Sequence, residues 1–430
     1  MAIPTLDSQL TQRDRAIIWH PFTQYETDPL PIAIVKAQGA YLYSDMGTRY
    51  IDAVSSWWTN LHGHSHPYIA EKIYEQAQNL QHVMFADYTH EPAILLAERL
   101  KAILPPGLNR FFYSDNGSTA VEAALKIIFQ FWHNKGAAPE KDVLICFKGG
   151  YHGDTFGAMS AAGKTSFNRP FWPFMFDVEW IDPPFAGKEE ESYAQLNALI
   201  EHKSVAGFIF EPIIQGFNGM KSHSAKGLDV LMEICEKNNI LTIADEVMTG
   251  FGRTGPLFAC EYLKHTPDII CLAKGLTGGA LPLALTVCKD FIFEGFQSQD
   301  RAAAFLHGHT YTANPLGCAA ALASLDLLLT NDCSAQRARI EASHLQFKEQ
   351  YQHLWERCEV QGTILSLEYK TREGDSGYFS SLKQRIVPHF FAKHVVLRPF
   401  GNYVHVLPPY CVSEEDLYHI YQTLLESLSC

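Results

Sequence analysis

Short apolar runs alternate with longer stretches of helical periodicity through the middle of the chain. Each run is bounded by turn or charged residues, which is typical of a buried strand in an α/β sheet. The runs are Val143–Phe147, Val205–Phe210, Ile240–Ala244, Ile269–Ala273 and Leu283–Cys288. Alternation of this kind predicts a mostly parallel sheet with helices on both of its faces.

Two helical stretches frame this region. The segment Thr119–Glu122 resembles a capping box and predicts the start of a helix. Apolar residues then recur at helical spacing, at Val121, Ala124, Leu125, Ile128 and Trp132. The second stretch, Pro315–Leu329, is expected to lead into a C-terminal lobe.

The two ends of the chain carry fewer strand patterns, and we expect them to join in one small domain. The predicted strands and the predicted final helix are Ile32–Lys36, Tyr41–Ser44, Thr363–Glu368, Tyr403–Val406 and Glu414–Ser427. The predicted division is therefore 1–65 and 326–430 for the small domain, and 66–325 for the large one.

Composition limits the classes of function. A chain of 430 residues that is 47% hydrophobic and 19% charged suits a globular protein with a large core. The net charge of -13 argues against non-specific binding to nucleic acid, and no apolar run is long enough to cross a membrane. Met1–Asp7 lacks a charged start and an apolar run, so we expect no signal peptide. The ten cysteines are scattered without a CxxC pair, which favours reduced thiols and a cytoplasmic protein.

Two strand ends carry the most informative residues. Asp245 directly follows the run that ends at Ala244, and Lys274 directly follows the run that ends at Ala273. Open α/β sheets bind ligands at the carboxyl ends of their strands, so we expect the two residues to share a site. Pyridoxal phosphate needs such a pair, a lysine for its Schiff base and an acid to keep its ring nitrogen protonated. A solvated lysine in a loop is the alternative.

A paired acid and base of a hydrolase is a competing interpretation of Asp245 and Glu246. Successive residues of a strand point to opposite faces, which argues against two carboxylates flanking one bond. A buried carboxylate needs a cationic partner, and a pyridinium N–H supplies one.

Two more segments could bind parts of a planar, phosphorylated cofactor. Ser114–Thr119 precedes a helix, and its backbone N–H groups with the Ser118 hydroxyl could hold a phosphate. A plain helix cap is the alternative. Tyr151 follows the Val143–Phe147 run and could cover a planar ring, or could be an ordinary core aromatic residue.

Several other side chains have two interpretations. Trp57 and its neighbour Trp58 could divide between the core and an exposed aromatic wall. Arg398 could be a solvated charge or a clamp for a substrate carboxylate. The histidine clusters are His62, His64 and His66, and His307 with His309. No carboxylate or cysteine pattern completes a zinc site around them, so we predict no metal.

Over nearly its whole length the chain resembles the fold-type I, class III pyridoxal phosphate aminotransferases. The segment Ala244–Gly255 and its spacing to Lys274 look like the signature of that class. The resemblance implies an α/β fold whose large domain holds a mostly parallel sheet of the seven-stranded type, with a small α+β domain built from both chain ends. It also implies a homodimer whose active sites form only when two subunits meet.

The same resemblance implies roles for single residues. Lys274 would form the Schiff base and move the proton, Asp245 would pair with the pyridinium nitrogen, and Tyr151 would stack on the ring. The cofactor phosphate would lie against Asn116, Gly117 and Ser118, with Thr310 from the other subunit. The residues implied to bind substrate are Phe22, Trp57, Tyr151, Lys274, Gly308 and Arg398.

Further segments are similar to members of the class that aminate 8-amino-7-oxononanoate in biotin biosynthesis. These segments are Ile18–Thr23, Ser55–Trp58, His82–Phe85, Gly150–Ser160 and Leu397–Gly401. The implied product is 7,8-diaminononanoate, formed by ping-pong transfer. We expect S-adenosyl-L-methionine as amino donor, with lysine as the alternative, because Phe22, His309 and His405 differ from residues common in adenosylmethionine-using members. Two other interpretations stay open, a class III aminotransferase for an ω-amino acid or diamine, and a non-catalytic binding protein of the same fold.

Overall fold

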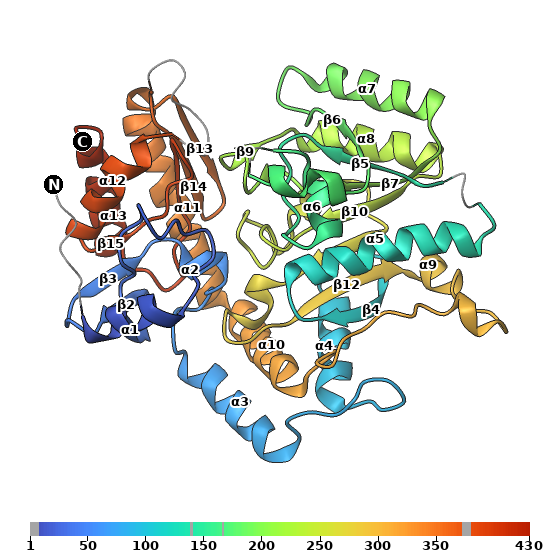
Figure 1. The fold of residues 1–430 in the computed structure, drawn as a ribbon, viewed down its shortest axis with the longest axis horizontal. Helices are drawn as coiled ribbons and strands as arrows, with labels where there is room; N and C mark the ends of the chain where they lie inside the picture. The colour runs from blue at the N-terminus through green and yellow to red at the C-terminus, as the bar shows by residue number, and fades with distance from the viewer. Residues whose placement is uncertain (1–7, 138–140, 166, 372–379) are drawn as a thin grey trace. The chain divides into compact units, whose positions relative to one another are not determined.

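The chain divides into two compact units (Figure 1). The computed structural model describes residues 8–137, 141–165, 167–371 and 380–430. The smaller unit holds Met1–Pro67 with Ala338–Cys430, and the larger unit holds Tyr68–Arg337. The sequence predicts boundaries after residues 65 and 325, whereas the two compact units divide after residues 67 and 337. The expectation about a signal peptide concerns residues 1–7, which lie outside the described residues.

The second boundary lies inside a continuous helix, α11 (Asn331–Tyr351). Arg337, in the second turn of this helix, donates a hydrogen bond from Nη1 to the carbonyl oxygen of Gly255 at 2.8 Å. The start of α11 therefore belongs with the larger unit. The predicted boundary falls earlier because sequence periodicity does not tell which unit each turn of a helix contacts.

A seven-stranded sheet forms the centre of the larger unit, in the order β4-β12-β11-β10-β7-β5-β6. Its strands are β4 (Leu108–Ser114), β5 (Val143–Phe147), β6 (Glu179–Ile181), β7 (Val205–Phe210), β10 (Leu241–Asp245), β11 (Ile269–Leu272) and β12 (Ala284–Lys289). All neighbouring pairs are parallel except the two that β12 makes. The predicted mostly parallel sheet is confirmed, although the apolar pattern missed β4 and β6.

Helices cover this sheet, and Figure 1 shows α5 running across it. The helices of the larger unit are α3 (Pro67–Asn79), α4 (Glu91–Lys101), α5 (Gly117–Asn134), α6 (Phe156–Ala162), α7 (Glu189–His202), α8 (Ala225–Lys237), α9 (Asp290–Glu294) and α10 (Pro315–Leu328). The apolar stripe of α5, including Val121 and Ile128, packs with strand residues such as Ile209 and Ile243 in one buried cluster. Burial of this stripe fixes the N-terminus of α5 at the edge where the strands end. A small hairpin, β8 (Ile214–Gln215) with β9 (Lys221–Ser222), follows β7.

The capping box of α5 lies one turn earlier than the sequence predicts. Asn116 is the cap, its side chain accepts from the Thr119 N–H at 3.1 Å, and its own N–H donates to Thr119 Oγ1 at 3.1 Å. Thr119 is thus the third helical residue rather than the cap. Glu122 instead accepts from the N–H groups of Gly157 and Ala158, at 2.7 and 3.1 Å, and so anchors α6.

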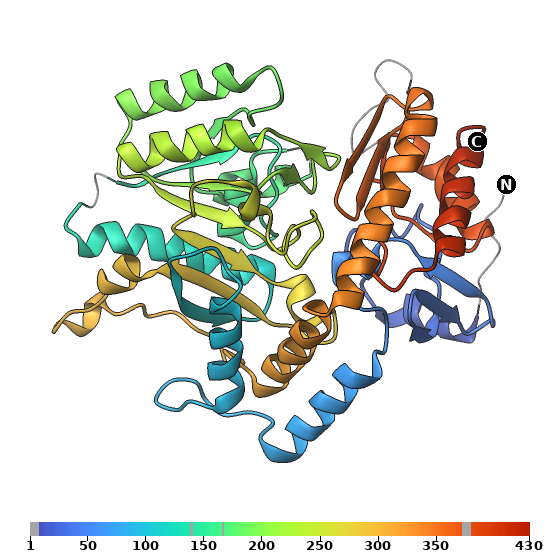
Figure 2. The same cartoon turned by 180° about the vertical axis from the view of Figure 1, so that it is seen from behind.

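The smaller unit joins both ends of the chain. Its sheets run β1-β2-β3-β15 and β13-β14-β16. The strands are β1 (Ile34–Gln38), β2 (Tyr41–Ser44), β3 (Arg49–Asp52), β13 (Arg357–Gln361), β14 (Ile364–Glu368), β15 (Val395–Val396) and β16 (Tyr403–Val406). Parallel pairing of β15 with β3 links the C-terminal segment to the N-terminal one, and Figure 2 shows the blue and red elements together. Its helices are α1 (Gln9–Ile17), α2 (Ser55–Trp58), α12 (Leu382–Ala392), α13 (Glu414–Ser427) and the rest of α11. The predicted α+β domain from both ends is confirmed.

Among the described residues, no single helix is both long and apolar enough to cross a membrane. Helix α10 and the stretch Asn331–Leu354 meet that test only when taken together, as a pair bent by 71°.

Candidate active site

Lys274 directly follows the loop residue after β11 and begins the 3₁₀ helix η3 (Lys274–Thr277). Its φ of 47° lies in the left-handed region that most side chains avoid, so the surrounding structure holds it there. The side chain keeps some accessible surface. Even so, enough protein surrounds its amine that desolvation lowers the pKa of Lys274 to about 8, against the opposing charges of Asp245 and Glu211. Lys274 is therefore a basic amine with two carboxylates near enough to affect its charge.

Asp245 ends β10, the strand next to β11, and its side chain is nearly buried at 5% exposure. His152 donates from Nδ1 to Asp245 Oδ2 at 2.7 Å, and the Val247 N–H donates to Oδ1 at 3.1 Å. His152 is also buried, and its Nε2 has no hydrogen-bond partner among the described residues. Two donors therefore fix the orientation of the Asp245 carboxylate.

Glu211 is a second buried acid at the same edge of the sheet, directly after β7. Its Oε1 accepts from the Tyr151 N–H at 3.0 Å, and its Oε2 accepts from the Gly216 N–H at 2.7 Å. Desolvation raises the pKa of Glu211 to about 7, with His152 opposing the rise and Asp245 adding to it. Glu211 was not among the predicted site residues, although it carries the same signal as Asp245, a carboxylate directly after an apolar run.

Tyr151 presents an aromatic ring beside these carboxylates. Its ring stacks on that of Phe217, with centroids 4.5 Å apart and an angle of 21° between the planes. Phe217 in turn contacts Phe167, with centroids 5.9 Å apart. Burial raises the pKa of the Tyr151 hydroxyl, and the charge of Asp154 adds to this effect. Tyr151 is therefore a neutral aromatic side chain at physiological pH.

The N-terminus of α5 packs closely against two neighbouring segments. A Cβ added at Gly117 would lie 2.6 Å from Val247 Cγ1, and one added at Gly153 would lie 2.0 Å from Ser118 Oγ. Only glycine allows these approaches. The helix start after Asn116 thus lies against the loops that carry Asp245 and Tyr151. Exposed N–H groups at a helix N-terminus suit a phosphate.

Glu246 contacts groups different from those that contact Asp245. It is fully buried, accepts from the Cys260 N–H at 2.7 Å and accepts from the Thr249 hydroxyl. Burial raises the pKa of Glu246. The two carboxylates have separate partners, which argues against the acid and base pair of a hydrolase.

In the smaller unit, Phe22, Trp57 and Arg398 lie together. The guanidinium carbon of Arg398 is 4.5 Å from the ring centre of Trp57 and 5.9 Å from that of Phe22, and the two rings are 5.4 Å apart. Trp58 is 4% exposed and contacts the ring of His405 at 5.7 Å. Burial lowers the pKa of His405 to about 3, so this histidine is neutral at physiological pH. The two tryptophans thus divide between a charged aromatic cluster and the core.

Gly308 and Thr310 occupy exposed positions in the larger unit. The segment that leads to them contacts the edge strand β4, where the Phe112 ring is 5.0 Å from that of Phe305 and 5.9 Å from that of His307. None of the contacts described above joins Gly308 or Thr310 to Lys274.

One histidine in each of the two clusters contacts a charged side chain. His64 donates to Asp52 at 2.8 Å, and His307 contacts the Lys126 amine at 3.0 Å. Within the ranges that the structure describes, no three His, Cys, Asp or Glu side chains are grouped so as to hold a metal.

The residues at the strand ends fit pyridoxal phosphate. The amine of Lys274 suits a Schiff base, the buried carboxyl group of Asp245 suits a protonated ring nitrogen, and the N-terminus of α5 suits a phosphate. His152 and Arg253 were not among the predicted site residues. Arg253 is 1% exposed, and its charge lowers the pKa of Lys274. A lysine and an acid at adjacent strand ends of such a sheet define a pyridoxal phosphate enzyme of fold type I.

Comparison with known proteins identifies the family. The model for class III aminotransferases matches residues 22–428. The chain is 44% identical to the adenosylmethionine-8-amino-7-oxononanoate aminotransferase of Synechococcus elongatus, over 96% of this chain and 98% of that relative. It is 36% identical to the enzyme of the same name from Geobacter sulfurreducens, over 99% of both chains. The chain therefore belongs to the class III aminotransferases, and its cofactor is pyridoxal phosphate.

Solved structures agree with this family. The adenosylmethionine-8-amino-7-oxononanoate aminotransferase of Methanocaldococcus jannaschii has a TM-score of 0.92 and 33% identity, over 98% of both chains. The omega transaminase of Pseudomonas jessenii in complex with PMP has a TM-score of 0.90 and 26% identity, again over 98% of both chains. High TM-scores to enzymes that are named for different activities mean that the fold alone does not select the substrate.

Proposed function

We propose that this aminotransferase converts 8-amino-7-oxononanoate to 7,8-diaminononanoate in biotin biosynthesis, with S-adenosyl-L-methionine as amino donor. The observation that carries the proposal is identity of 44% and 36%, over nearly the whole chain, to relatives named for this reaction. An ω-amino acid or diamine aminotransferase is the second candidate, because structural neighbours include omega transaminases at 26–27% identity.

Lys274 and Asp245 carry the chemistry in this proposal. Pyridoxal phosphate supplies an electron sink for the charge left when a carbon–hydrogen bond of the donor breaks. Lys274 Nζ would hold the cofactor, and as a free amine it would accept the proton that the donor carbon loses and return it. Its pKa of about 8 gives a useful fraction of neutral amine near physiological pH. Asp245, whose carboxylate is oriented by His152, would keep the ring nitrogen protonated.

The remaining cofactor contacts come from the α5 N-terminus and the loop after β5. Asn116, Gly117 and Ser118 hold the phosphate with backbone N–H groups and the Ser118 hydroxyl. Tyr151 covers the ring face and borders the substrate, and its stacking on Phe217 limits the positions that its ring can take.

Substrate recognition depends on the smaller unit. Arg398 binds the carboxylate of the keto substrate through its planar guanidinium group. Trp57 and Phe22 contact that guanidinium and line the path of the aliphatic chain. Gly308 leaves room beside the substrate, because it has no side chain.

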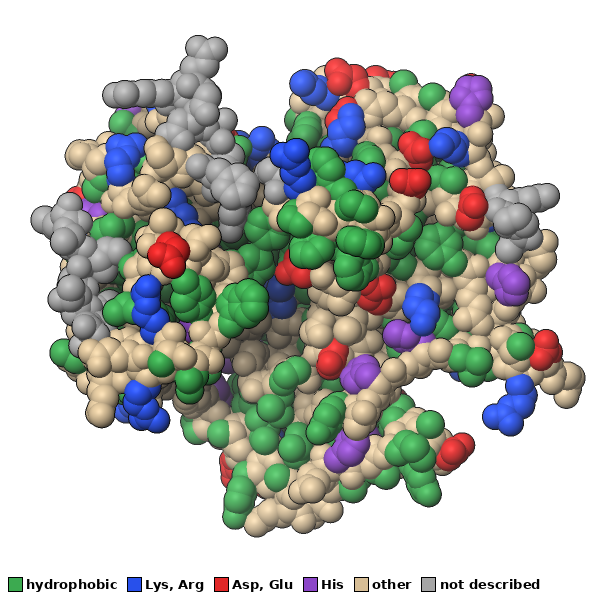
Figure 3. Space-filling model, viewed as in Figure 1, with side chains coloured by type: hydrophobic (Ala, Val, Ile, Leu, Met, Phe, Trp, Pro, Cys, Tyr) green, Lys and Arg blue, Asp and Glu red, His purple; other side chains and the backbone are tan. Residues whose placement is uncertain are grey.

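The proposed assembly is a homodimer in which Thr310 of one subunit contacts the cofactor phosphate of the other. Exposed apolar side chains support a second copy as the partner: Leu306 is 78% exposed and Tyr311 is 61% exposed, on either side of Thr310. Figure 3 shows further hydrophobic side chains gathered over α6. In that region Phe156 is 53% exposed and contacts Phe174, which is 73% exposed. Surfaces of this kind commonly mark an interface.

Shared active sites have a direct test. Lys274→Ala and Thr310→Glu should each be inactive alone, yet mixed subunits should regain activity, because one of the two sites in a mixed dimer carries neither change. Mixtures that stay inactive, although native mass spectrometry shows that mixed dimers form, would argue against shared sites.

We expect the enzyme in the cytoplasm, with the scattered cysteines as reduced thiols. Eight of the ten cysteines are buried, which fits packing rather than exchange with solvent.

The donor is identified by a single half-reaction. The yellow protein is mixed with S-adenosyl-L-methionine, lysine or an ω-amino acid, without keto substrate, and the cofactor absorbance is followed. Conversion by S-adenosyl-L-methionine, reversed by 8-amino-7-oxononanoate, is the expected result. Conversion by lysine alone would change the donor, and conversion only by an ω-amino acid or diamine would favour the second candidate.

A further inference from the structure

The segment that carries Trp57 has an unusual backbone. In the short helix α2, Ser55 has φ of 49°, Ser56 has φ of 61° with ψ of -80°, and Trp58 has φ of 67°. These are three of the four residues of α2, and none is a glycine. Residues other than glycine rarely adopt such angles unless neighbouring groups hold them there. The contacts that hold α2 therefore also determine where Trp57 lies.

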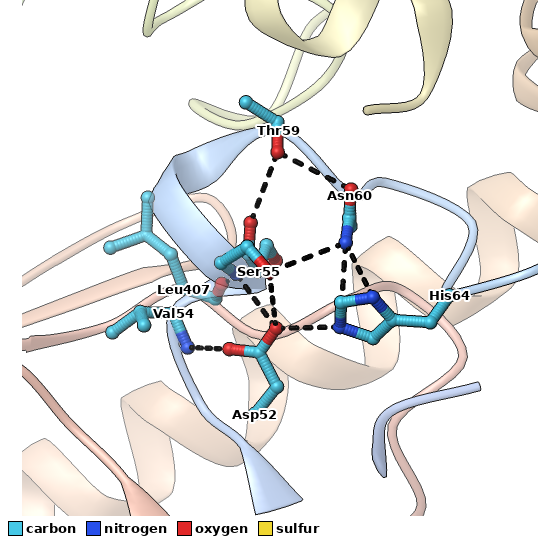
Figure 4. A network of polar contacts seen from close by, with 8 residues as sticks. Asp52, Val54, Ser55, Thr59, Asn60, His64 and Leu407 are labelled. Atoms are coloured by element: carbon cyan, nitrogen blue, oxygen red, sulfur yellow. Dashed lines mark hydrogen bonds and ion pairs between the residues drawn. The ribbon is translucent and has the colours of Figure 1, made fainter. Parts of the chain in front are cut away.

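A buried carboxylate supplies most of these contacts (Figure 4). Asp52 ends β3 and is 0% exposed. Its Oδ1 accepts from the Val54 N–H at 3.1 Å, and its Oδ2 accepts from the Ser56 N–H at 2.7 Å and from the Ser56 hydroxyl at 3.3 Å. Ser55 adds a hydrogen bond of 2.6 Å to the Leu407 carbonyl oxygen. One carboxylate thus binds the chain on both sides of Ser55.

His64 completes the cluster. Its Nε2 lies 2.8 Å from Asp52 Oδ2, and its Nδ1 lies 2.7 Å from Asn60 Nδ2. The amide nitrogen of Asn60 is a donor, so Nδ1 accepts and Nε2 carries the proton that it donates to Asp52. The backbone of His64 is fixed as well, through hydrogen bonds of 3.1 and 2.8 Å with Gly39.

This arrangement is not a catalytic triad. The Ser56 hydroxyl donates to Asp52 rather than to the imidazole, and the two ring nitrogens of His64 face Asn60 and Asp52. A serine nucleophile would need the imidazole to accept its proton. The cluster therefore holds the backbone and has no geometry for attack on a substrate.

We propose that Asp52 and His64 are positioning residues that hold Trp57 against Arg398, and so set the affinity for the keto substrate. Neither side chain needs to touch the substrate. Ser56, bound by Asp52, is the residue directly before Trp57, whose ring lies 4.5 Å from the Arg398 guanidinium carbon. Loss of the clamp releases the strained backbone, and Trp57 and Arg398 lose their fixed relation. This inference rests on the proposed roles of Trp57 and Arg398 in substrate binding.

The first test is kinetic and uses the full-length holoenzyme. His64→Ala should raise KM for 8-amino-7-oxononanoate by about tenfold or more, because small misplacements of binding groups have large effects. The kcat and the cofactor spectrum should change little. His64→Gln should restore most of the affinity, since its amide can donate to Asp52 and accept from Asn60. His62→Ala is the matched control from the same loop and should behave as wild type.

Trp57 itself provides a coupling test. If His64 acts through Trp57, His64→Ala should have almost no further effect on KM in a Trp57→Ala background. Equal effects in both backgrounds would overturn the proposal, as would a fall in kcat and melting temperature that His64→Gln does not rescue.

A second readout needs no substrate, so it separates this inference from the proposed function. The fluorescence difference between the protein and its Trp57→Phe variant reports the environment of Trp57 alone. Acrylamide should quench this Trp57 fluorescence more strongly in His64→Ala and in Asp52→Asn, because the tryptophan becomes more accessible to solvent. Unchanged quenching in both folded variants would overturn the clamp. A wild-type protein that does not act on 8-amino-7-oxononanoate, but whose variants show the stronger quenching, would instead count only against the proposed function.

Discussion

His152 donates a hydrogen bond from Nδ1 to Asp245 Oδ2 at 2.7 Å, and both side chains are almost completely buried. A buried carboxylate without a donor would be costly, and His152 supplies a donor that fixes the orientation of the Asp245 carboxylate. The strand-end pair of Asp245 and Lys274 therefore depends on a residue that belongs to neither strand.

The first prediction concerns this hydrogen bond. His152→Leu should lower kcat by roughly 10- to 100-fold, because a hydrogen bond to a charged group contributes about 1.5–3 kcal/mol. His152→Asn should keep much more activity, since its amide can donate from nearly the same position as Nδ1. Steady-state kinetics with saturating pyridoxal phosphate measures both. Equal losses in the two variants would mean that ring packing, rather than the donor, is what matters.

Lys274 gives a prediction about cofactor attachment. Only a neutral amine forms a Schiff base, and the pKa of Lys274 is lowered to about 8 by desolvation. The rate at which the cofactor-free protein binds pyridoxal phosphate covalently should therefore rise from about pH 7 and level off near pH 9, one unit above that pKa. Stopped-flow absorbance follows this step. A rate that still rises steeply at pH 10 would indicate an ordinary lysine.

Glu211 gives a prediction about stability. Its pKa is raised from the ordinary value of 4.5 to about 7. A carboxyl group whose pKa is higher in the folded state contributes stability below pH 4.5, and this stability is lost as the pH rises to 7. The melting temperature of wild type minus that of Glu211→Gln should therefore fall across this interval, whatever its starting value. Calorimetry of the cofactor-free proteins measures the difference, and a rise with pH would contradict the assigned shift.

Gly117 tests the close approach at the α5 N-terminus. A Cβ there would lie 2.6 Å from Val247 Cγ1, so Gly117→Ala must displace the helix start or the segment after Asp245. We expect weaker binding of pyridoxal phosphate, measured by equilibrium dialysis. Adding Val247→Ala removes the Cγ1 atom that the new Cβ would clash with, and should restore part of the affinity for pyridoxal phosphate. A double variant no better than Gly117→Ala would mean that the clash is relieved elsewhere.

Much of the larger unit could be predicted because its strands are continuous apolar runs. The predicted bounds of β5 and β7 agree with those observed, since both strands are almost fully buried. β4 was missed because its sequence, Leu108–Ser114, contains Asn109 and Arg110 on a strand at the edge of the sheet. Edge strands tolerate polar residues, so they lose the pattern that identifies a central strand.

The sequence points to candidate site residues where chemistry and local pattern coincide. Lys274 and Asp245 combine a reactive group with the end of a buried strand: Asp245 ends β10, and Lys274 lies two residues after the last residue of the adjacent strand β11. The hydrogen bond from His152 to Asp245 was not predicted, because these residues lie 93 positions apart and leave no trace in local periodicity. The bond between His64 and Asp52, 12 positions apart, also joins segments that no single helix or strand pattern connects. The strained backbone around Trp57 was not predicted either, because positive φ angles are typical of glycine and not of residues such as Ser55, Ser56 and Trp58.

The central claim is transamination of 8-amino-7-oxononanoate through Lys274, and a product assay tests it most directly. Purified protein with pyridoxal phosphate, S-adenosyl-L-methionine and 8-amino-7-oxononanoate is analysed by mass spectrometry for 7,8-diaminononanoate. We expect the diamine from wild type and none from Lys274→Ala, which should still bind some cofactor without a covalent bond. Absence of the diamine with wild type and every donor tried, or wild-type turnover by Lys274→Ala, would contradict the account.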